Sequence, residues 1–461
     1  MKQEFDNAKK RKFTFCLAVF SIVIPVVSVI IFFLWSSSYL DSSKVIPLNQ
    51  SEQQSLENLL NNTYPQNRNE KLKSLPYQTK SASLNVASGA AILVDCSNGC
   101  ILYEKNADEI IPPASLTKLF VMYVVFKEIR DGNLSLDEYV QPPESSWAIN
   151  MPADSSLMFL GQGHKVTVDE LLAGLAVASG NDAALALAYK ISGSTKAFVD
   201  RMNYEAMALG LEKTHFVEPS GYSEKNVTTA RELAEFCRIY INTFPESLEK
   251  YHSRTEISYP LQKNLPSWQQ DKGDSFAVYQ KNTNPLLGKM EGCDGLKTGF
   301  IYESGYNLAL TAQRKNVRFL SVTMKGPGIG SKEGNFYRVK DGTLLMEWAF
   351  SSFKNYFPFE HLPPFFTIPV PAGKQKFVNL VPAWENAVTV PVFSENAAEV
   401  KAEVSVPRYI FGGTEKGKVY GQIQYKIGEI VLETVPLVAD RNVEKSGIWG
   451  KFWGSLATYR L

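Results

Sequence analysis

The N-terminal part of the chain combines a basic cluster with a long apolar run. Four consecutive basic residues, 9–12, precede 23 uncharged residues, Phe13–Trp35. At about 1.5 Å rise per residue, a helix of this length crosses a bilayer. The run exceeds the roughly 7–15 apolar residues of a cleaved signal peptide, so it favours an uncleaved membrane anchor at residues 1–35 over a cleaved signal. Either interpretation keeps the basic cluster inside and exports the rest of the chain.

The polar and apolar pattern divides the following residues into a linker and a domain. Residues 36–84 are rich in Ser, Asn, Gln and Lys, with little apolar periodicity, which predicts a polar linker. In residues 85–360, two strand-like runs around Ser97-Asn98-Gly99 predict a hairpin. Helical patterns follow at 115–130, 168–178, 182–192 and 195–209, and strand patterns return at 305–325. This order predicts an α+β domain with an antiparallel sheet and a helical cluster.

The pattern changes again near residues 361–364. Up to residue 440, short alternating runs such as Ala387–Val392 predict a small all-β domain, 361–440. In the tail, 441–461, apolar residues recur every three or four positions on one helical face: Ile448, Trp449, Phe452, Trp453, Leu456 and Tyr459. Two tryptophans and a phenylalanine on one face suit a membrane interface. Docking of this helix onto the protein's own surface is the alternative.

Composition then limits the classes of function. The 461 residues are 44% hydrophobic and 21% charged, values that exclude a disordered chain and a polytopic membrane protein. The 48 Lys and Arg against 47 Asp and Glu argue against a nucleic-acid partner. The four histidines are scattered, which predicts neither a histidine metal site nor a Ser-His-Asp triad. Five cysteines exclude a disulfide scaffold; Cys96 and Cys100 flank the hairpin turn, either bridged or as free thiols.

Ser115-Leu116-Thr117-Lys118 is the first candidate catalytic motif. Two prolines precede it, which suits a helix start, and the apolar residues Leu119–Phe126 predict a buried helix. Lys118 lies one turn from Ser115 on the same face. Desolvation lowers the pKa of a buried lysine, and a neutral amine can take the proton of a serine hydroxyl. A helix cap with a snorkelling lysine is the alternative, and the same spacing recurs at Ser247/Lys250 and Ser351/Lys354.

Two further polar motifs follow. Ser179-Gly180-Asn181 interrupts two apolar helical segments, so it faces a cleft or is satisfied internally. Its serine can relay protons and its amide can hold a substrate carbonyl, with a helix cap as the alternative. In Lys297-Thr298-Gly299, an edge or bulge position must direct both Lys297 and Thr298 inward, and Gly299 permits close approach of another backbone. This strand then suits a substrate carboxylate.

The three motifs occur in one order, 64 and 118 residues apart, and together they are the set of penicillin-binding proteins and class A β-lactamases. With Asn282–Leu287 and the β domain behind them, they make the sequence resemble the serine-type D-alanyl-D-alanine carboxypeptidases, the low-molecular-weight penicillin-binding proteins, over residues 85–440. The resemblance implies a penicillin-binding/β-lactamase-like transpeptidase domain at 85–360, followed by the small all-β domain. It also implies that the tail is a membrane tether.

The resemblance implies a role for each motif residue: Ser115 as nucleophile, Lys118 as general base, Ser179 as proton relay, Asn181 as the group that orients the substrate amide, and Lys297 and Thr298 as carboxylate-binding residues. The backbone N–H groups of Ser115 and Phe300 would form the oxyanion hole. No metal or other cofactor is implied. The implied partners are a peptidoglycan stem peptide ending in D-Ala-D-Ala, β-lactam antibiotics, and membrane lipid at both termini. The catalytic domain would lie on the extracytoplasmic side of the cell membrane.

The chain departs from the family pattern at one position of the site. Family members often have threonine where this chain has Ile301, which removes a hydroxyl beside the cleft. Arg338 lies where relatives supply a further cation, but the alignment slips by a residue or two and we assign it no role. A β-lactamase is a poorer match, because class A enzymes have Ser-Asp-Asn at the second motif and lack the β domain. The motifs also allow a related endopeptidase or transpeptidase, or an inactive wall-binding homologue.

Overall fold

The computed structural model describes residues 48–63, 71–77, 84–360, 362–392 and 400–458. The chain divides into two compact units. The large unit comprises Gln66–Tyr356 and Ala387–Ala397, and the small unit comprises Met1–Pro65, Phe357–Asn386 and Ala398–Leu461. No helix within the described ranges is both long and apolar enough to span a membrane, and the expected anchor at residues 1–35 lies outside those ranges.

The large unit is built on a six-stranded sheet in the order β1-β3-β2-β10-β9-β8. The strands are β1 (Lys73–Ser74), β2 (Ala90–Asp95), β3 (Cys100–Lys105), β8 (Cys293–Ile301), β9 (Gly305–Arg314) and β10 (Val317–Gly326). β1 and β3 are parallel and the other neighbours are antiparallel. The expected hairpin is β2–β3, and β8, which carries the third motif, lies at an edge of the sheet.

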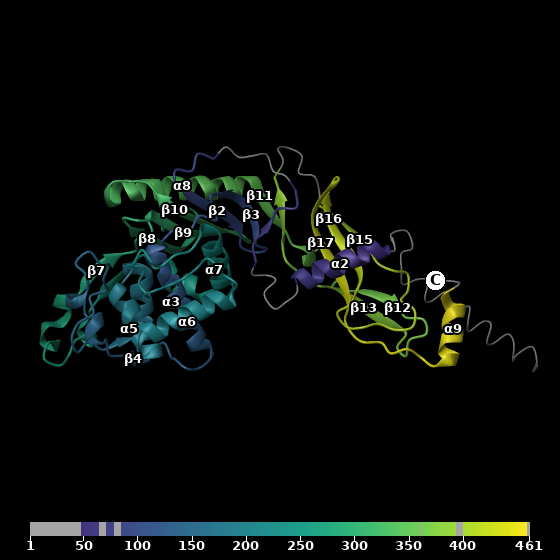
Figure 1. Cartoon of the computed structure of the whole chain (residues 1–461), viewed down its shortest axis with the longest axis horizontal. Helices are drawn as coiled ribbons and strands as arrows, with labels where there is room; N and C mark the ends of the chain where they lie inside the picture. Colours follow the sequence, from purple (N-terminus) through teal and green to yellow (C-terminus); the bar gives the residue numbers. More distant parts are fainter. Residues whose placement is uncertain (1–47, 64–70, 78–83, 361, 393–399, 459–461) are drawn as a thin grey trace, which may run out of the picture. The chain divides into compact units, whose positions relative to one another are not determined.

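Both faces of this sheet are covered, as β2 illustrates. Its six residues are all buried. Ile92 and Val94 belong to the core shared with the helical cluster, whereas Leu93 belongs to the core shared with α8 (Gly330–Ser352). Successive side chains of a strand point to opposite faces, so a continuous apolar run is expected between two layers. Figure 1 shows α8 on one side of the sheet and the helical cluster on the other.

The helical cluster confirms the predicted α+β fold. It contains α3 (Lys118–Arg130), α4 (Val168–Ala173), α5 (Asn181–Ser192), α6 (Thr195–Ala208) and α7 (Ala230–Thr243). The helix expected at 115–130 starts with a 3₁₀ turn, Ala114–Thr117, and the one expected at 168–178 ends in a π-helical segment, Gly174–Ala178. The two-stranded sheets of this unit pair β4 (Tyr139–Val140) with β5 (Val166–Thr167), β6 (Glu256–Tyr259) with β7 (Val278–Lys281), and β11 (Phe353–Tyr356) with β14 (Val388–Pro391).

The small unit is β-rich, as predicted. Its five-stranded antiparallel sheet has the order β12-β13-β17-β16-β15. The strands are β12 (Phe366–Pro369), β13 (Phe377–Pro382), β15 (Lys401–Ser405), β16 (Val419–Ile427) and β17 (Ile430–Ala439). The side chains of β16 alternate strictly between buried and half-buried, as expected for a sheet with one face on the core. The C-terminal helix α9 spans Ile448–Thr458, and Tyr459 of the expected apolar face lies outside the described residues.

Part of residues 36–84, which we predicted as a polar linker, is folded. Residues Gln50–Thr63 form a helix, α2, that belongs to the small unit, and Lys73–Ser74 form β1. Asn49 and Glu52 cap α2 reciprocally, each side chain accepting the other's backbone N–H at 2.9 Å. Leu56 is buried, and Gln53 Nε2 donates to the Val419 carbonyl at 3.2 Å. The polar composition of this segment gives too weak an apolar periodicity to reveal the helix.

The interpretation of Ala387–Val392 as part of the small β domain is wrong. β14 pairs with β11 in the large unit. The Thr389 hydroxyl donates to Asp95 Oδ2 at 2.9 Å and accepts from Asn98 Nδ2 at 2.7 Å. Asp95 is fully buried, and burial raises the pKa of its carboxyl group. A buried carboxylate requires such donors, so this contact explains why β14 returns to the large unit.

Candidate active site

Ser115 lies in the 3₁₀ turn that leads into α3. The turn is held by Asn307, whose Nδ2 donates to the Pro112 and Pro113 carbonyls at 3.2 and 3.3 Å. Two glycines let other backbone segments press against it. A Cβ on Gly221 would lie 1.9 Å from the Ala114 oxygen, and one on Gly299 would lie 3.1 Å from the Ser115 nitrogen. The serine is therefore fixed from both sides while its own side chain stays half-buried.

The Lys118 ammonium group meets three oxygens. Its Nζ lies 2.9 Å from Ser115 Oγ, 2.7 Å from Asn181 Oδ1 and 2.5 Å from the Ser220 carbonyl oxygen. The amide and carbonyl oxygens can only accept, whereas the serine hydroxyl can also donate. A neutral amine has two N–H groups and one lone pair, which match two acceptors and one donating hydroxyl. The geometry therefore suits Lys118 as the acceptor of the Ser115 proton.

Burial makes this neutral form accessible. Lys118 has no exposed surface, and desolvation lowers its pKa from 10.5 to about 7. The negative charges of Glu218 and Asp182 oppose that shift and keep the pKa from falling further. A group with a pKa near 7 can both accept and return a proton at neutral pH.

Asn181 and Ser179 are placed differently by the structure. Ser179 is buried and has left-handed backbone angles, φ 58° and ψ 32°, between the π-helical segment and α5. Asn181 is the first residue of α5, and the neighbouring Asp182 accepts the backbone N–H groups of Met158, Phe159 and Leu160 at 2.8–3.1 Å. Only Asn181 is hydrogen-bonded to Lys118. Within the described ranges, no hydrogen bond joins the Ser179 hydroxyl to another site residue.

Lys297 and Thr298 lie on the edge strand β8, and both are buried. Lys297 Nζ donates to the Thr298 carbonyl at 3.1 Å, and Thr298 Oγ1 donates to Thr283 Oγ1 at 2.7 Å. No carboxylate among the described residues lies within ion-pair distance of Lys297. Burial, together with the positive charges of Lys118 and Arg338, lowers the pKa of Lys297 well below 10.5. A buried cation without a counter-ion is suited to receive an anionic group.

Sequence reasoning missed the other residues that hold this site. Ser220 supplies the third oxygen around Lys118. Arg338, to which we assigned no role, donates to the Gly299 carbonyl at 2.5 Å and the Asn307 carbonyl at 3.1 Å, and so supports β8 from α8. His252 Nδ1 lies 3.2 Å from the Leu296 carbonyl, and burial lowers the pKa of this histidine to about 3. For Ser220, the turn signal Glu218-Pro219-Ser220-Gly221 is the hint that the sequence contains.

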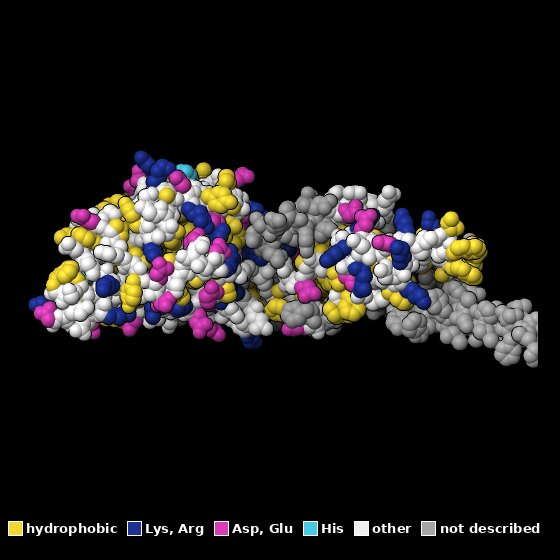
Figure 2. Space-filling view, turned by 90° about the horizontal axis from the view of Figure 1, so that it is seen from below, with side chains coloured by type: hydrophobic (Ala, Val, Ile, Leu, Met, Phe, Trp, Pro, Cys, Tyr) yellow, Lys and Arg dark blue, Asp and Glu magenta, His cyan; other side chains and the backbone are white. Residues whose placement is uncertain are grey.

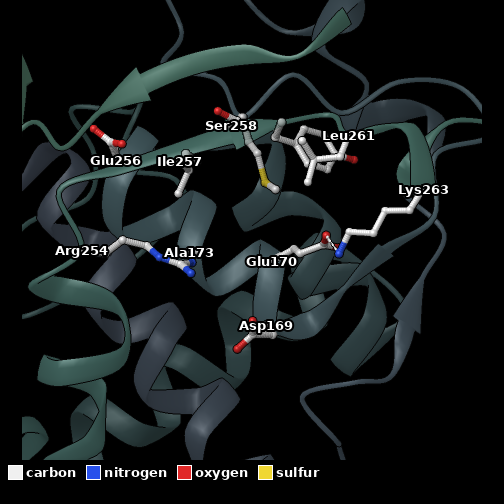
Figure 3. A pocket seen from close by; sticks show the side chains of 11 residues that line it. Asp169, Glu170, Ala173, Arg254, Glu256, Ile257, Ser258, Leu261 and Lys263 are labelled. Atoms are coloured by element: carbon white, nitrogen blue, oxygen red, sulfur yellow. Dashed lines mark ion pairs between the residues drawn. The ribbon is translucent and has the colours of Figure 1, made fainter. Parts of the chain in front are cut away.

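Other candidate chemical groups lie apart from these residues. Cys96 and Cys100 are not bridged to each other, and burial raises the pKa of Cys96 to about 12. Within the described residues, no three His, Cys, Asp or Glu side chains form a group that could hold a metal. A pocket of about 390 Å³ lies between α4 and β6, and Figure 3 shows the Glu170–Lys263 ion pair at its edge. None of the six motif residues lines that pocket.

Comparison with known proteins connects both units to one family. Residues 77–328 match the family model described as D-alanyl-D-alanine carboxypeptidase, and residues 363–445 match the C-terminal domain of penicillin-binding protein 5. The chain is 32% identical to the D-alanyl-D-alanine carboxypeptidase DacC of Escherichia coli, over 80% of this chain and 87% of that protein. It is 30% identical to DacF of Bacillus subtilis, over 78% of this chain and 86% of that protein. Penicillin-binding protein 5 of Haemophilus influenzae has a similar structure, with a TM-score of 0.68 and 29% identity over 80% of this chain and all of the other.

Proposed function

The chain belongs to the D-alanyl-D-alanine carboxypeptidase family and is a serine-type carboxypeptidase, and we propose that it removes the terminal D-alanine from peptidoglycan pentapeptides through an acyl-enzyme on Ser115. The observation that carries this proposal is the triple contact of Lys118 with Ser115, Asn181 and the Ser220 carbonyl. It supplies a serine hydroxyl, a lysine with a pKa near 7, and a substrate-orienting amide at one point.

The proposed reaction begins with neutral Lys118. Its amine takes the Ser115 proton as Oγ attacks the carbonyl carbon of the penultimate D-alanine. The bond from that carbon to the terminal nitrogen then breaks, and the proton passes to the departing D-alanine, with Ser179 as the proposed relay. In a second step, water attacks the ester carbonyl carbon and gives its proton to Lys118. The ester bond breaks, and the proton passes to the departing Ser115 Oγ. The Ser115 and Phe300 N–H groups would stabilise the oxyanion, and the approach of Gly299 to the Ser115 nitrogen supports this arrangement.

Mass spectrometry tests this proposal on the intact protein. A peptide ending in D-Ala-D-Ala should lose one alanine, and penicillin should add its mass once to the protein. Cross-linked peptide dimers would instead indicate a transpeptidase. Cleavage of cross-linked dimers would indicate an endopeptidase, which is what one relative from Pseudomonas aeruginosa is named. If no substrate is converted and penicillin does not label the protein, the chain is an inactive wall-binding homologue.

We expect Lys297→Gln to lower kcat/KM by about one to two orders of magnitude for a peptide with a free terminal carboxylate. The substitution removes a charge-assisted hydrogen bond, worth roughly 1.5–3 kcal/mol, in a site where Lys297 has no carboxylate partner among the described residues. The matching C-terminal amide should be affected far less, because it carries no anion. Steady-state kinetics on both peptides provides the measurement.

Lys289→Gln is the matched control for this substitution, since Lys289 is exposed in the turn before β8. It should leave both substrates at wild-type rates. An equal loss on acid and amide in Lys297→Gln would contradict carboxylate binding and would point to a structural role for that lysine.

The proposal extends to the location of the protein. We propose that residues 1–35 anchor the chain and that 36–84, which contain α2 and β1, lead to a catalytic domain on the extracytoplasmic side. The catalytic domain comprises 85–360 together with β14, and the β domain is the remainder of 361–440. A membrane-binding tail, 441–461, follows. α9 packs against Ala372 through the buried Gly454, but its apolar face is left uncovered. Four side chains of that face are each more than half exposed, which supports this interpretation of the tail: Ile448, Trp449, Phe452 and Trp453. Figure 2 shows hydrophobic side chains gathered where α9 lies in the small unit.

Substitution of Trp449, Phe452 and Trp453 by serine should weaken vesicle binding of a chain that lacks residues 1–35 by at least about tenfold, because interfacial binding scales with buried apolar area. Vesicle co-sedimentation measures the effect. Phe336→Ser, at an exposed position of α8 in the large unit, is the control. Unchanged binding of the triple variant would remove α9 from the membrane interface.

A further inference from the structure

The loop between α6 and α7 carries a carboxylate that is surrounded by donors from its own loop. Glu218 accepts from Ser220 N at 2.7 Å, Ser220 Oγ at 2.5 Å, Gly221 N at 2.6 Å, Ser223 N at 3.3 Å and Asn226 Nδ2 at 3.0 Å. No Lys or Arg of the described residues forms an ion pair with it. Five donors on one carboxylate fix the course of the backbone through residues 218–226.

This loop is in direct contact with both reacting groups of the proposed site. The Ser220 carbonyl oxygen, between two N–H groups held by Glu218, accepts from Lys118 Nζ at 2.5 Å. The next residue, Gly221, has φ +80° and lies against the turn of Ser115, where a Cβ would be 1.9 Å from the Ala114 oxygen. The loop therefore has no room to shift toward Ser115, and Glu218 prevents it from shifting away.

From this geometry we infer that Glu218 is a positioning residue for catalysis: it holds the Ser220 carbonyl against Lys118 and supplies the negative charge that the lysine faces from this loop. The inference rests on the proposed role of Lys118 as general base. Glu218 itself touches neither Ser115 nor Lys118 within hydrogen-bond distance, so its action passes through the Ser220 backbone and through space.

The charged groups around Lys118 set the direction of the electrostatic effect. From α5, Asp182 contributes a buried carboxylate that is occupied by backbone N–H groups. From β8, Lys297 contributes a positive charge, and the positive charge of Arg338 on α8 in turn lowers the pKa of Lys297. Glu218 and Asp182 both raise the pKa of Lys118 against the larger effect of burial. Removal of the Glu218 charge must therefore lower the pKa of Lys118 below about 7.

Glu218→Gln is the first test. A glutamine turns one of the two oxygens into an NH₂ group that faces N–H donors, so the loop should relax and the Ser220 carbonyl should leave Lys118. We expect acylation by penicillin to slow by about tenfold to a hundredfold, and the acid limb of its pH profile to move to lower pH. Glu224→Gln, the same change at an exposed position of the same loop, should keep the wild-type rate and profile.

Glu218→Asp separates charge from geometry. It retains the carboxylate but is one methylene too short to meet all five donors, so the rate should fall while the acid limb stays near its wild-type position. An acid limb that moves equally in Asp and Gln variants would overturn the electrostatic part of the inference. A Gln variant indistinguishable from Glu224→Gln would overturn it entirely.

A measurement without turnover keeps the inference distinct from the proposed function. Titration of ¹³C-labelled lysine ε-carbons by NMR reports the pKa of Lys118, with the resonance assigned from its loss in Lys118→Arg. This pKa should be lower in Glu218→Gln than in wild type and unchanged in Glu224→Gln. Absence of acylation in the wild-type protein would refute the proposed function, whereas an unshifted lysine titration would refute the inference about Glu218. If Glu218→Gln failed to fold, Glu218→Asp would be titrated instead. The pKa of Lys118 in this variant should stay near its wild-type value, and a shifted pKa would contradict the inference.

Discussion

Ser115→Ala is expected to abolish both release of D-alanine and covalent labelling by penicillin, while the protein stays folded. The only hydrogen bond of the Ser115 side chain among the described residues is the one with Lys118, and the side chain is half-buried. Its loss should therefore change the free energy of unfolding by about 1 kcal/mol or less. Both reactions should stop because, in the part of the chain that the structure describes, no other hydroxyl is hydrogen-bonded to Lys118. Mass spectrometry of the protein after incubation with penicillin measures the label, and thermal unfolding measures the fold.

The two other serines with a lysine three residues on provide the controls. Ser247 is buried in a turn before a π-helical segment, and Ser351 is exposed at the end of α8, where its Oγ donates to the Trp348 carbonyl. Ser247→Ala and Ser351→Ala should keep full labelling. A label that persisted in Ser115→Ala and mapped to either of these serines would show that the site is elsewhere.

The fold of the large unit could be predicted from the sequence because its elements bury apolar residues with a clear period. β2 is continuously apolar and α3 is buried nearly all round, and both patterns follow from a sheet between two layers. α2 and β14 could not be assigned in the same way. Each is placed by partners far along the chain, Val419 for Gln53 and Asp95 for Thr389, and a local period contains no information about such partners.

In the candidate site too, contacts between residues close in sequence could be predicted, whereas contacts with residues far along the chain could not. Ser115 and Lys118 are one helical turn apart, so their approach could be predicted from spacing alone. The third oxygen on Lys118 belongs to Ser220, 102 residues away, and its placement depends on the hydrogen bonds of Glu218. The resemblance implies that Ser179 relays a proton, but no hydrogen bond joins it to Lys118 among those of the described residues. Its role therefore stays a prediction.

Lys118→Arg is expected to lower the rate of acylation by at least about three orders of magnitude at neutral pH. Arginine retains the positive charge, but its pKa exceeds about 12, so its neutral fraction at pH 7 is below roughly 10⁻⁵. Lys118, with a pKa of about 7, is close to half neutral under the same conditions. The planar guanidinium also has no lone pair for the Ser115 proton. Stopped-flow acylation by penicillin measures the loss.

The pH profile makes this prediction specific to proton transfer. In the wild type, acylation should fall about tenfold per unit below pH 7, because protonation of Lys118 removes the base. In Lys118→Arg that limb should be absent. Lys127→Arg, the same change at a half-buried position of α3 where Lys127 pairs with Glu205 at 2.7 Å, should behave as wild type. Near-normal acylation in Lys118→Arg would reduce Lys118 to an electrostatic partner, and the buried hydroxyl of Ser179 would become the better candidate for the base.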